Sequence, residues 1–276
     1  MEAQQSGRGG YVPNSIWDDL AQEHILEPTE ALEIKRGFFK RVFGTLYERL
    51  GTLLLLNVAV SVQLGIGAAI GLLLAVTFRA TGVATLVFLG FGITLLTAPA
   101  LAGLFTYVRA ICDDDALPAL ADYWRGMRKY AVRSWLLAFA QVGAGALLVL
   151  NLRFYASIHS GIALAVIFVM LLLLLLWAMA GLYAWPLLVR DLSWGLLVRN
   201  SALLALAAPF STIAILVVLS ALSAVLIAIR IGWLLLLFVA WAVTENVALQ
   251  RLVRIFRERQ QSSTTPEPTE VADPSI

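Results

Sequence analysis

Residues 83–133 join a long apolar run to a charged connector, and this arrangement constrains the fold more than any other feature. The first part, VATLVFLGFGITLLTAPALAGLFTYVRAI, can cross a bilayer as a helix, which takes about 20 mostly apolar residues. The second part, CDDDALPALADYWRGMRKYAVR, is charged and ends where the next apolar run begins at Ser134. A span that leads into a basic connector also indicates the orientation of its neighbours. The sequence therefore predicts a polytopic membrane protein.

The composition supports lipid as the solvent of this chain. Of its 276 residues, 60% are hydrophobic and 14% are charged, whereas about 25% are charged in a typical soluble domain. The net charge of +2 gives no broad basic field, so no nucleic-acid partner is expected. One cysteine and two histidines exclude an intramolecular disulfide and make a zinc site of Cys and His unfavourable. We expect no cofactor.

Six apolar runs predict an all-α fold, a polytopic bundle of about six transmembrane helices: residues 53–78, 83–108, 135–152, 162–188, 203–229 and 231–249. Residues 34–50 place aromatic and aliphatic side chains on one side and predict an interfacial amphipathic helix before the first span. The expected domains are a mobile cytoplasmic arm (1–33), this helix (34–50), a membrane domain (51–255) with a cytoplasmic connector (112–133), and a disordered cytoplasmic tail (256–276).

The distribution of basic residues predicts the orientation. If successive connectors alternate between the two sides, all but three of the 20 Lys and Arg residues fall on one side, the exceptions being Arg79, Arg153 and Arg230. Basic residues accumulate in cytoplasmic loops. We therefore expect a multi-pass protein of the cell (plasma) membrane with both termini in the cytoplasm.

The connector contains a candidate docking face. Read as a helix at about 100° per residue, residues 116–133 separate an apolar side from a basic side that includes Arg125, Lys129 and Arg133. Such a helix would lie along the inner leaflet, where each basic residue near an anionic surface contributes about 1 kcal/mol. It would hold the connector to lipid or present it to a soluble partner. Alternatively, these charges only enforce the topology.

Polar side chains inside or at the end of apolar runs are the other candidate functional residues: Asn57, Gln63, Gln141, Asn151 and Glu245. A polar group without water must find a partner or a wet cavity. The amides are interpreted first as hydrogen-bonding links between helices. For Glu245 the first interpretation is local ion pairing with Arg251 or Arg254, and the second is a role in a polar pathway.

Glycine and proline predict where helices approach and bend. Gly67 and Gly71 form a GxxxG pattern, which lets a second backbone come close. Pro99 and Pro209 each remove a backbone donor within or near a span, so kinks are expected there. The chain has no recognisable nucleophile elbow, HExxH motif or Walker loop, and we predict that it is not an enzyme.

Several of these segments together resemble the YesL family of bacterial integral membrane proteins, domain of unknown function 624. They are Asn57 in the first span, LTAPALAGLFTYVRAI closing the second, Asp122-Tyr-Trp-Arg in the connector, NLRFYA from Asn151 and YAWPLLVR from Tyr183. The likeness covers residues 49–205. This chain departs from the family pattern in its longer first span and in the acidic residues 113–115.

The resemblance implies a multi-span protein of bacterial plasma membranes, often associated with carbohydrate uptake and use, and it supplies no catalytic residues. We therefore expect an accessory component of carbohydrate uptake or utilisation. The alternatives are a scaffold or sensor that acts through its cytoplasmic segments and a transporter that works alone. The expected partners are the lipid bilayer and either other membrane transport components or further copies of the chain.

Overall fold

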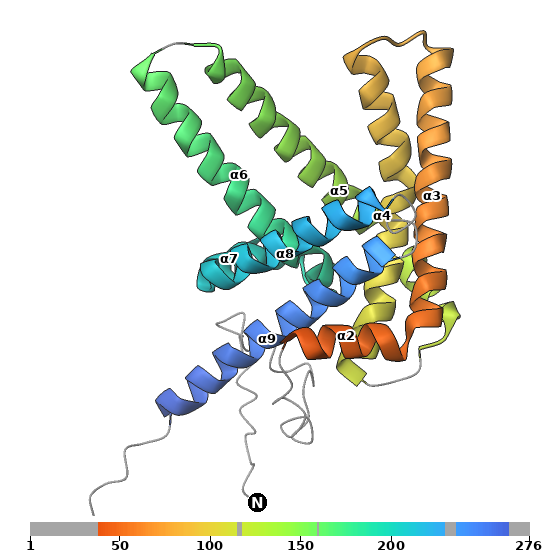
Figure 1. The fold of residues 1–276 in the computed structure, drawn as a ribbon, viewed down its shortest axis with the longest axis vertical. Coiled ribbons are helices and arrows are strands. Elements are labelled where there is room, and N and C mark those ends of the chain that lie inside the picture. Colours follow the sequence, from red (N-terminus) through yellow and green to blue (C-terminus); the bar gives the residue numbers. More distant parts are fainter. Residues whose placement is uncertain (1–37, 115–117, 159, 230–235, 265–276) are drawn as a thin grey trace, which may run out of the picture. The chain divides into compact units, whose positions relative to one another are not determined.

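The computed structural model describes residues 38–114, 118–158, 160–229 and 236–264, and all regular elements in these ranges are helices (Figure 1). The prediction of an all-α fold is confirmed. In chain order the helices are α2 (Phe38–Glu48), α3 (Leu50–Thr77), α4 (Val83–Asp114), α5 (Leu120–Ala156), α6 (Gly161–Leu188), α7 (Trp194–Ala207), α8 (Pro209–Ala228) and α9 (Phe238–Thr264). The predicted arm at residues 1–33 lies outside the described residues. The predicted tail begins at residue 256, but α9 continues to Thr264.

Five of the described helices are long and apolar enough to cross a membrane: α3, α4, α5, α6 and α8. The chain is a multi-pass membrane protein. The first four predicted runs correspond to α3 through α6. Neighbouring helices α3 and α4 pack side by side, and so do α5 and α6 (Figure 1).

The fifth predicted run is divided at Ala208 into α7 and α8. The residue that follows, Pro209, has no backbone N–H and disfavours helical geometry at the residue before it. Ala208 accordingly has φ −140° and ψ 64°, and Pro209 occupies the first turn of α8, where a missing N–H costs nothing. The hydroxyl of Thr212 donates to the Ala208 carbonyl at 3.0 Å and lies 2.9 Å from the hydroxyl of Tyr183 in α6. The contact between Tyr183 and Thr212 thus attaches the start of α8 to α6.

The sixth predicted run is only partly described, because residues 230–235 lie outside the described ranges. The helix that follows, α9, is not among the five candidate spans. It packs against α2, α3, α4 and α6, and its residues 239–240, 242–250 and 252–253 are buried. In the described part of the chain, this segment is therefore a central packing helix with a polar C-terminal half.

Close contact between α3 and α4 depends on three glycines, Gly67 and Gly71 in α3 and Gly92 in α4. A Cβ atom added at Gly67 would lie 2.5 Å from the Gly92 carbonyl oxygen, and one at Gly71 would lie 2.5 Å from that of Phe88. Atoms of a real side chain do not approach a backbone this closely, so only glycine fits at either position. The GxxxG pattern in the first span therefore marks the interface between these two helices.

A proline in α4 is compensated from α5. Pro99 has no N–H to donate to the carbonyl of Leu95, one helical turn earlier. The indole Nε1 of Trp135 in α5 donates to that carbonyl oxygen at 2.8 Å. In an apolar environment an unsatisfied carbonyl is costly, so this bond fixes α5 against the weak point of α4.

The connector helix and the third span form one continuous helix, α5, with no proline in its 37 residues. Its length, about 55 Å at 1.5 Å per residue, exceeds the roughly 30 Å hydrocarbon core. Leu120 and Trp124, which belong to the predicted apolar side, are exposed and thus available to lipid, whereas the side that contains Tyr123, Gly126 and Tyr130 is buried within the protein. Close packing explains this, because a Cβ atom at Gly126 would lie 2.5 Å from the Thr106 hydroxyl in α4.

Candidate intramembrane binding site

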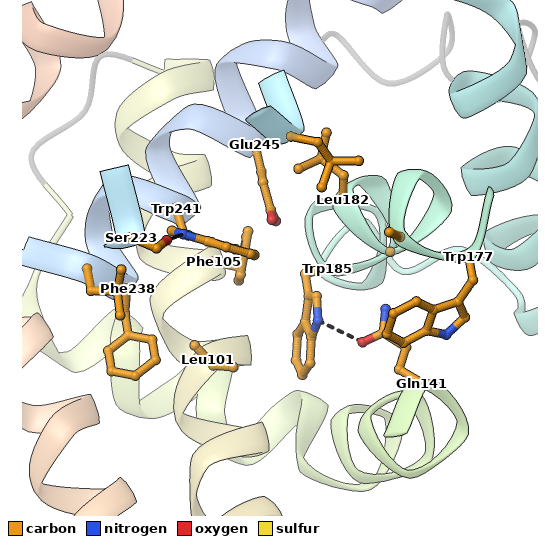
Figure 2. A pocket seen from close by; sticks show the side chains of 14 residues that line it. Leu101, Phe105, Gln141, Trp177, Leu182, Trp185, Ser223, Phe238, Trp241 and Glu245 are labelled. Atoms are coloured by element: carbon orange, nitrogen blue, oxygen red, sulfur yellow. Dashed lines mark hydrogen bonds between the residues drawn. The ribbon is translucent and has the colours of Figure 1, made fainter. Parts of the chain in front are cut away.

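A cavity of about 520 Å³ lies among α4, α5, α6, α8 and α9 (Figure 2). Five helices contribute its walls, so it depends on the packing of the whole bundle. Its lining is largely aromatic and aliphatic and includes the following side chains: Leu101, Phe105, Gln141, Trp177, Leu182, Trp185, Ser223, Phe238, Trp241 and Glu245. Trp177, Trp185 and Trp241 are only partly buried, which leaves the cavity open at its rim.

Glu245 is the one charged residue among the side chains that line the cavity. It is 2% exposed, and its carboxyl group points into the space between Trp241 and Trp185 (Figure 2). Within the described ranges, its Oε2 atom has no hydrogen-bond partner. The ion pair with Arg251 or Arg254 that the sequence favoured is not seen there. A buried carboxylate without a partner is costly, so this position calls for an explanation.

Two of the three cavity tryptophans are held by hydrogen bonds. Trp185 Nε1 donates to Oε1 of Gln141 at 3.1 Å, which joins α6 to α5 (Figure 2). Trp241 Nε1 donates to the Ser223 hydroxyl at 2.8 Å, which joins α9 to α8. The Trp185 ring also stacks on Phe105 of α4, with centroids 6.1 Å apart. These contacts fix the orientation of the aromatic walls.

The helix that carries Glu245 is positioned at both ends of its buried part. The side-chain Oδ1 of Asn57, which is fully buried in α3, accepts a bond from the backbone N–H of Val239 at 3.0 Å. The first turn of a helix has backbone N–H groups without intrahelical partners, and Asn57 supplies one acceptor. Further along α9, Gln250 Nε2 donates to the carbonyl oxygen of Cys112 at the end of α4. Asn57 is therefore a link between helices and is not part of the cavity wall.

The other predicted amides lie in three different places. Gln141 lines the cavity. Gln63 of α3 lies near the Tyr123 hydroxyl in α5, at 3.4 Å, and does not line it. Asn151 donates to the carbonyl oxygen of Leu147 in its own helix at 2.8 Å. The structure thus brings together Gln141 and Glu245 and leaves Gln63 and Asn151 outside the site.

The predicted basic face of α5 is engaged in ion pairs within the chain. Arg125 pairs with Asp122 at 2.7 Å, Lys129 pairs with Asp191, and Arg133 lies 3.8 Å from Asp191. Partial burial raises the pKa of Asp191, but hydrogen bonds from Lys129 and Tyr130 outweigh this effect and hold the pKa below its usual value. The three basic side chains remain partly or largely exposed, so a docking role for this face stays a prediction.

Sequence reasoning missed most of the aromatic wall. Trp177, Trp241 and Ser223 lie within apolar runs, where a tryptophan or a serine is unremarkable without knowledge of its neighbours. Trp185 was noticed only as part of the segment YAWPLLVR. One signal could have found the site: Glu245 and Trp241 lie four residues apart, which places them on the same face of a helix.

No protein-family model, no curated protein and no solved structure matches this chain. The fold and the site therefore define only the class of protein to which this chain belongs. The chain is an all-helical, multi-pass membrane protein with an aromatic cavity that contains a buried carboxyl group.

Proposed function

We propose that this membrane protein binds a small, mostly apolar molecule in the cavity around Glu245. The observation that supports the proposal most is a buried carboxyl group, 2% exposed, that points into a space of about 520 Å³ and whose Oε2 has no partner in the described ranges. Ligand pockets in proteins are typically about 300–1,000 Å³, apolar, with a few polar groups that fix orientation. This cavity has that size and that composition.

A purely structural role explains these features less well. Close packing is the rule in protein interiors, and an empty cavity lowers stability in proportion to its volume. A buried polar atom without a partner lowers it further. Both costs occur here at one place, and a bound molecule would offset both.

The polar groups suit a ligand with few hydrogen-bonding atoms. Gln141, Ser223 and Glu245 are the polar side chains of the wall apart from the indoles, and they come from three helices. Gln141 and Ser223 already accept bonds from Trp185 and Trp241. A sugar, with a hydroxyl on most of its carbons, would find fewer partners here than it needs.

We also propose, from the resemblance to the YesL family, that the protein is an accessory component of carbohydrate uptake in a bacterial plasma membrane. Segments that carry the resemblance contribute Leu101, Phe105 and Trp185 to the cavity wall, so the proposed binding site lies in the part of the chain on which the resemblance rests. The bound molecule would then be a cofactor or regulator of uptake and not the sugar itself. A deletion strain should show reduced uptake of at least one labelled oligosaccharide; normal uptake of every sugar tested would contradict this role.

The binding function itself can be tested with a cavity-filling variant. A Cβ atom at Gly181 has only Gln141 Nε2 nearby, at 3.5 Å, so Gly181→Leu should fill the cavity without disturbing the backbone. Gly143→Leu is the matched control, because a Cβ atom there has no neighbour within 4 Å and the residue does not line the cavity. The measurement is the thermal stability of each purified protein in the presence of a panel of small apolar and amphipathic compounds.

At a concentration of 100 times Kd, a ligand stabilises the folded state by about 2.7 kcal/mol. We expect at least one compound to raise the Tm of the natural chain and of Gly143→Leu but not that of Gly181→Leu. Equal stabilisation of all three proteins, or of none, would contradict the proposed function.

A further inference from the structure

We propose that the molecule bound in this cavity is an organic cation, with Glu245 as its counter-ion and the aromatic side chains as its cage. This inference rests on the proposed function, because it names the chemical class of ligand for the same site. It follows from three features of the cavity: its charge, the nature of its walls and the way those walls are held.

The charge of the cavity is unbalanced. Among the described residues that line it there is no Lys, Arg or His, and Glu245 is the single ionisable group. Arg251, one of the nearest basic residues along α9, is exposed, whereas Glu245 faces inward. A carboxylate within the bundle needs a positive partner or a hydrogen-bond donor. A cationic ligand would supply the positive partner, whereas a neutral ligand could supply only a hydrogen-bond donor and an anionic one would be repelled.

The walls are suited to a cation. Trp177, Trp185 and Trp241 line the same space as Glu245, together with Phe105 and Phe238 (Figure 2). The face of an aromatic ring carries partial negative charge and attracts a cation, most strongly for tryptophan and more strongly where water is excluded. Cages of this kind recognise quaternary ammonium groups. Tryptophan rings and a carboxylate in the same cavity would therefore both favour a positively charged ligand.

Two of the three indole groups are also pre-oriented. Trp185 and Trp241 use their N–H groups on Gln141 and Ser223, so these two donors are not free to bind Glu245 or an anion. Because the rings are held before the ligand arrives, less conformational entropy is lost on binding.

The test compares two probes of the same size and shape and of opposite charge, tetraphenylphosphonium and tetraphenylborate. Equilibrium binding of each labelled probe is measured with the purified full chain in a neutral detergent. The variants are Glu245→Gln, Glu245→Asp and Trp185→Leu. Glu48→Gln is the control, because this exposed residue of α2 does not line the cavity.

We expect the cation to bind at least 10-fold more tightly than the anion. Glu245→Gln should reduce the affinity for the cation at least 10-fold and remove the preference for the cation over the anion. Glu245→Asp should retain most of the affinity for the cation, and Glu48→Gln should leave this affinity unchanged. Trp185→Leu should weaken binding of the cation more than that of the anion. Since Trp185→Leu keeps the carboxylate, it tests the proposal even if a change at Glu245 prevents folding.

Two competitors separate the possible sources of an ammonium group. Benzyltrimethylammonium represents a free amine, and diheptanoylphosphatidylcholine represents a lipid headgroup; the one that displaces tetraphenylphosphonium at the lower concentration identifies the source. Equal binding of both probes, lost in Gly181→Leu but unchanged in Glu245→Gln, would overturn the cation proposal and leave the proposed function intact. If Gly181→Leu changes the binding of neither probe, both proposals fail.

Discussion

The hydroxyl oxygen of Tyr130 lies 3.0 Å from Oδ2 of Asp191 and 3.0 Å from the carbonyl oxygen of Val189. Arg109 of α4 donates to the same carbonyl at 2.7 Å, and Lys129 pairs with Asp191. The segment between α6 and α7 is thereby attached to α4 and α5. Asp191 has φ +57°, a conformation that aspartate adopts more readily than most residues. This attachment holds the end of α6, the helix that provides Trp177 and Trp185 to the cavity.

The attachment should weaken in acid. The pKa of Asp191 is lower in the folded protein than in the unfolded chain, so its contribution is fully present above the unfolded pKa and is lost as the pH falls through the folded pKa. With its side chain 50% exposed, the ion pair is worth at most about 1 kcal/mol. Between pH 7 and pH 3, the natural chain should lose more thermal stability than Asp191→Asn, measured as Tm in detergent. Equal losses in the two proteins would contradict the assignment.

The α3–α4 interface should tolerate only glycine at Gly71. In Gly71→Ala the added Cβ would lie 2.5 Å from the Phe88 carbonyl oxygen and 2.7 Å from the Cα atom of Leu89, so the helices must separate. Overpacking of this kind typically costs about 1–3 kcal/mol. Gly65→Ala, in the same helix but with no atom within 4 Å of the new Cβ, is the control and should leave stability unchanged or slightly raised. Unfolding in graded SDS compares the two, and equal stability would disprove this close approach.

The bond from Trp135 to Leu95 should matter only while Pro99 is present. Trp135→Phe removes the donor to the partly buried Leu95 carbonyl and should cost at most about 1–3 kcal/mol, the penalty for a buried acceptor without a partner. In Pro99→Ala the backbone N–H of residue 99 can donate to that carbonyl, so the same tryptophan change should cost less. A double-mutant cycle on the free energy of unfolding measures the difference. Additive effects would show that the indole does not compensate for the proline.

Where the sequence pattern is strong, it predicts this fold well. Four of the six apolar runs became α3 to α6, because a long apolar segment has few alternatives to a helix in lipid. Gly67 and Gly71 marked a real interface. The break at Ala208 was foreseeable from Pro209, yet hydropathy joined the two sides because the residues next to Ala208 on both sides are mostly apolar.

The candidate site was predictable only in part, since it depends on contacts between distant helices. Glu245 and Gln141 stood out as polar residues in apolar surroundings, and both line the cavity. No local pattern could reveal that Trp185 in α6 and Trp241 in α9 meet around them. The interpretation of Glu245 as an ion-paired residue relied only on its position along the chain. The direction of its side chain is set instead by the packing of α9 against four other helices.

The charge distribution predicts an orientation in the membrane, and labelling can test it. In a Cys112→Ser background, a membrane-impermeant thiol reagent should label Ala80→Cys, in the connection between α3 and α4, from outside intact cells. A cytoplasmic C-terminus requires an even number of crossings, and five described helices are candidate spans. Ser263→Cys, near the C-terminus of α9, therefore tests whether the sixth predicted run also crosses: in the six-span prediction it should be labelled only after the cells are opened. Labelling of Ser263→Cys in intact cells would contradict a cytoplasmic C-terminus.

Thiol modification can show whether Glu245 faces a cavity that small molecules enter. In the Cys112→Ser background, the rate of reaction with methyl methanethiosulfonate is measured for Glu245→Cys and for its neighbour Asn246→Cys. Asn246 is fully buried and does not line the cavity. We expect Glu245→Cys to react at least 10-fold faster than Asn246→Cys, and we expect the addition of Gly181→Leu to remove this difference. Equal rates at the two positions would contradict this expectation.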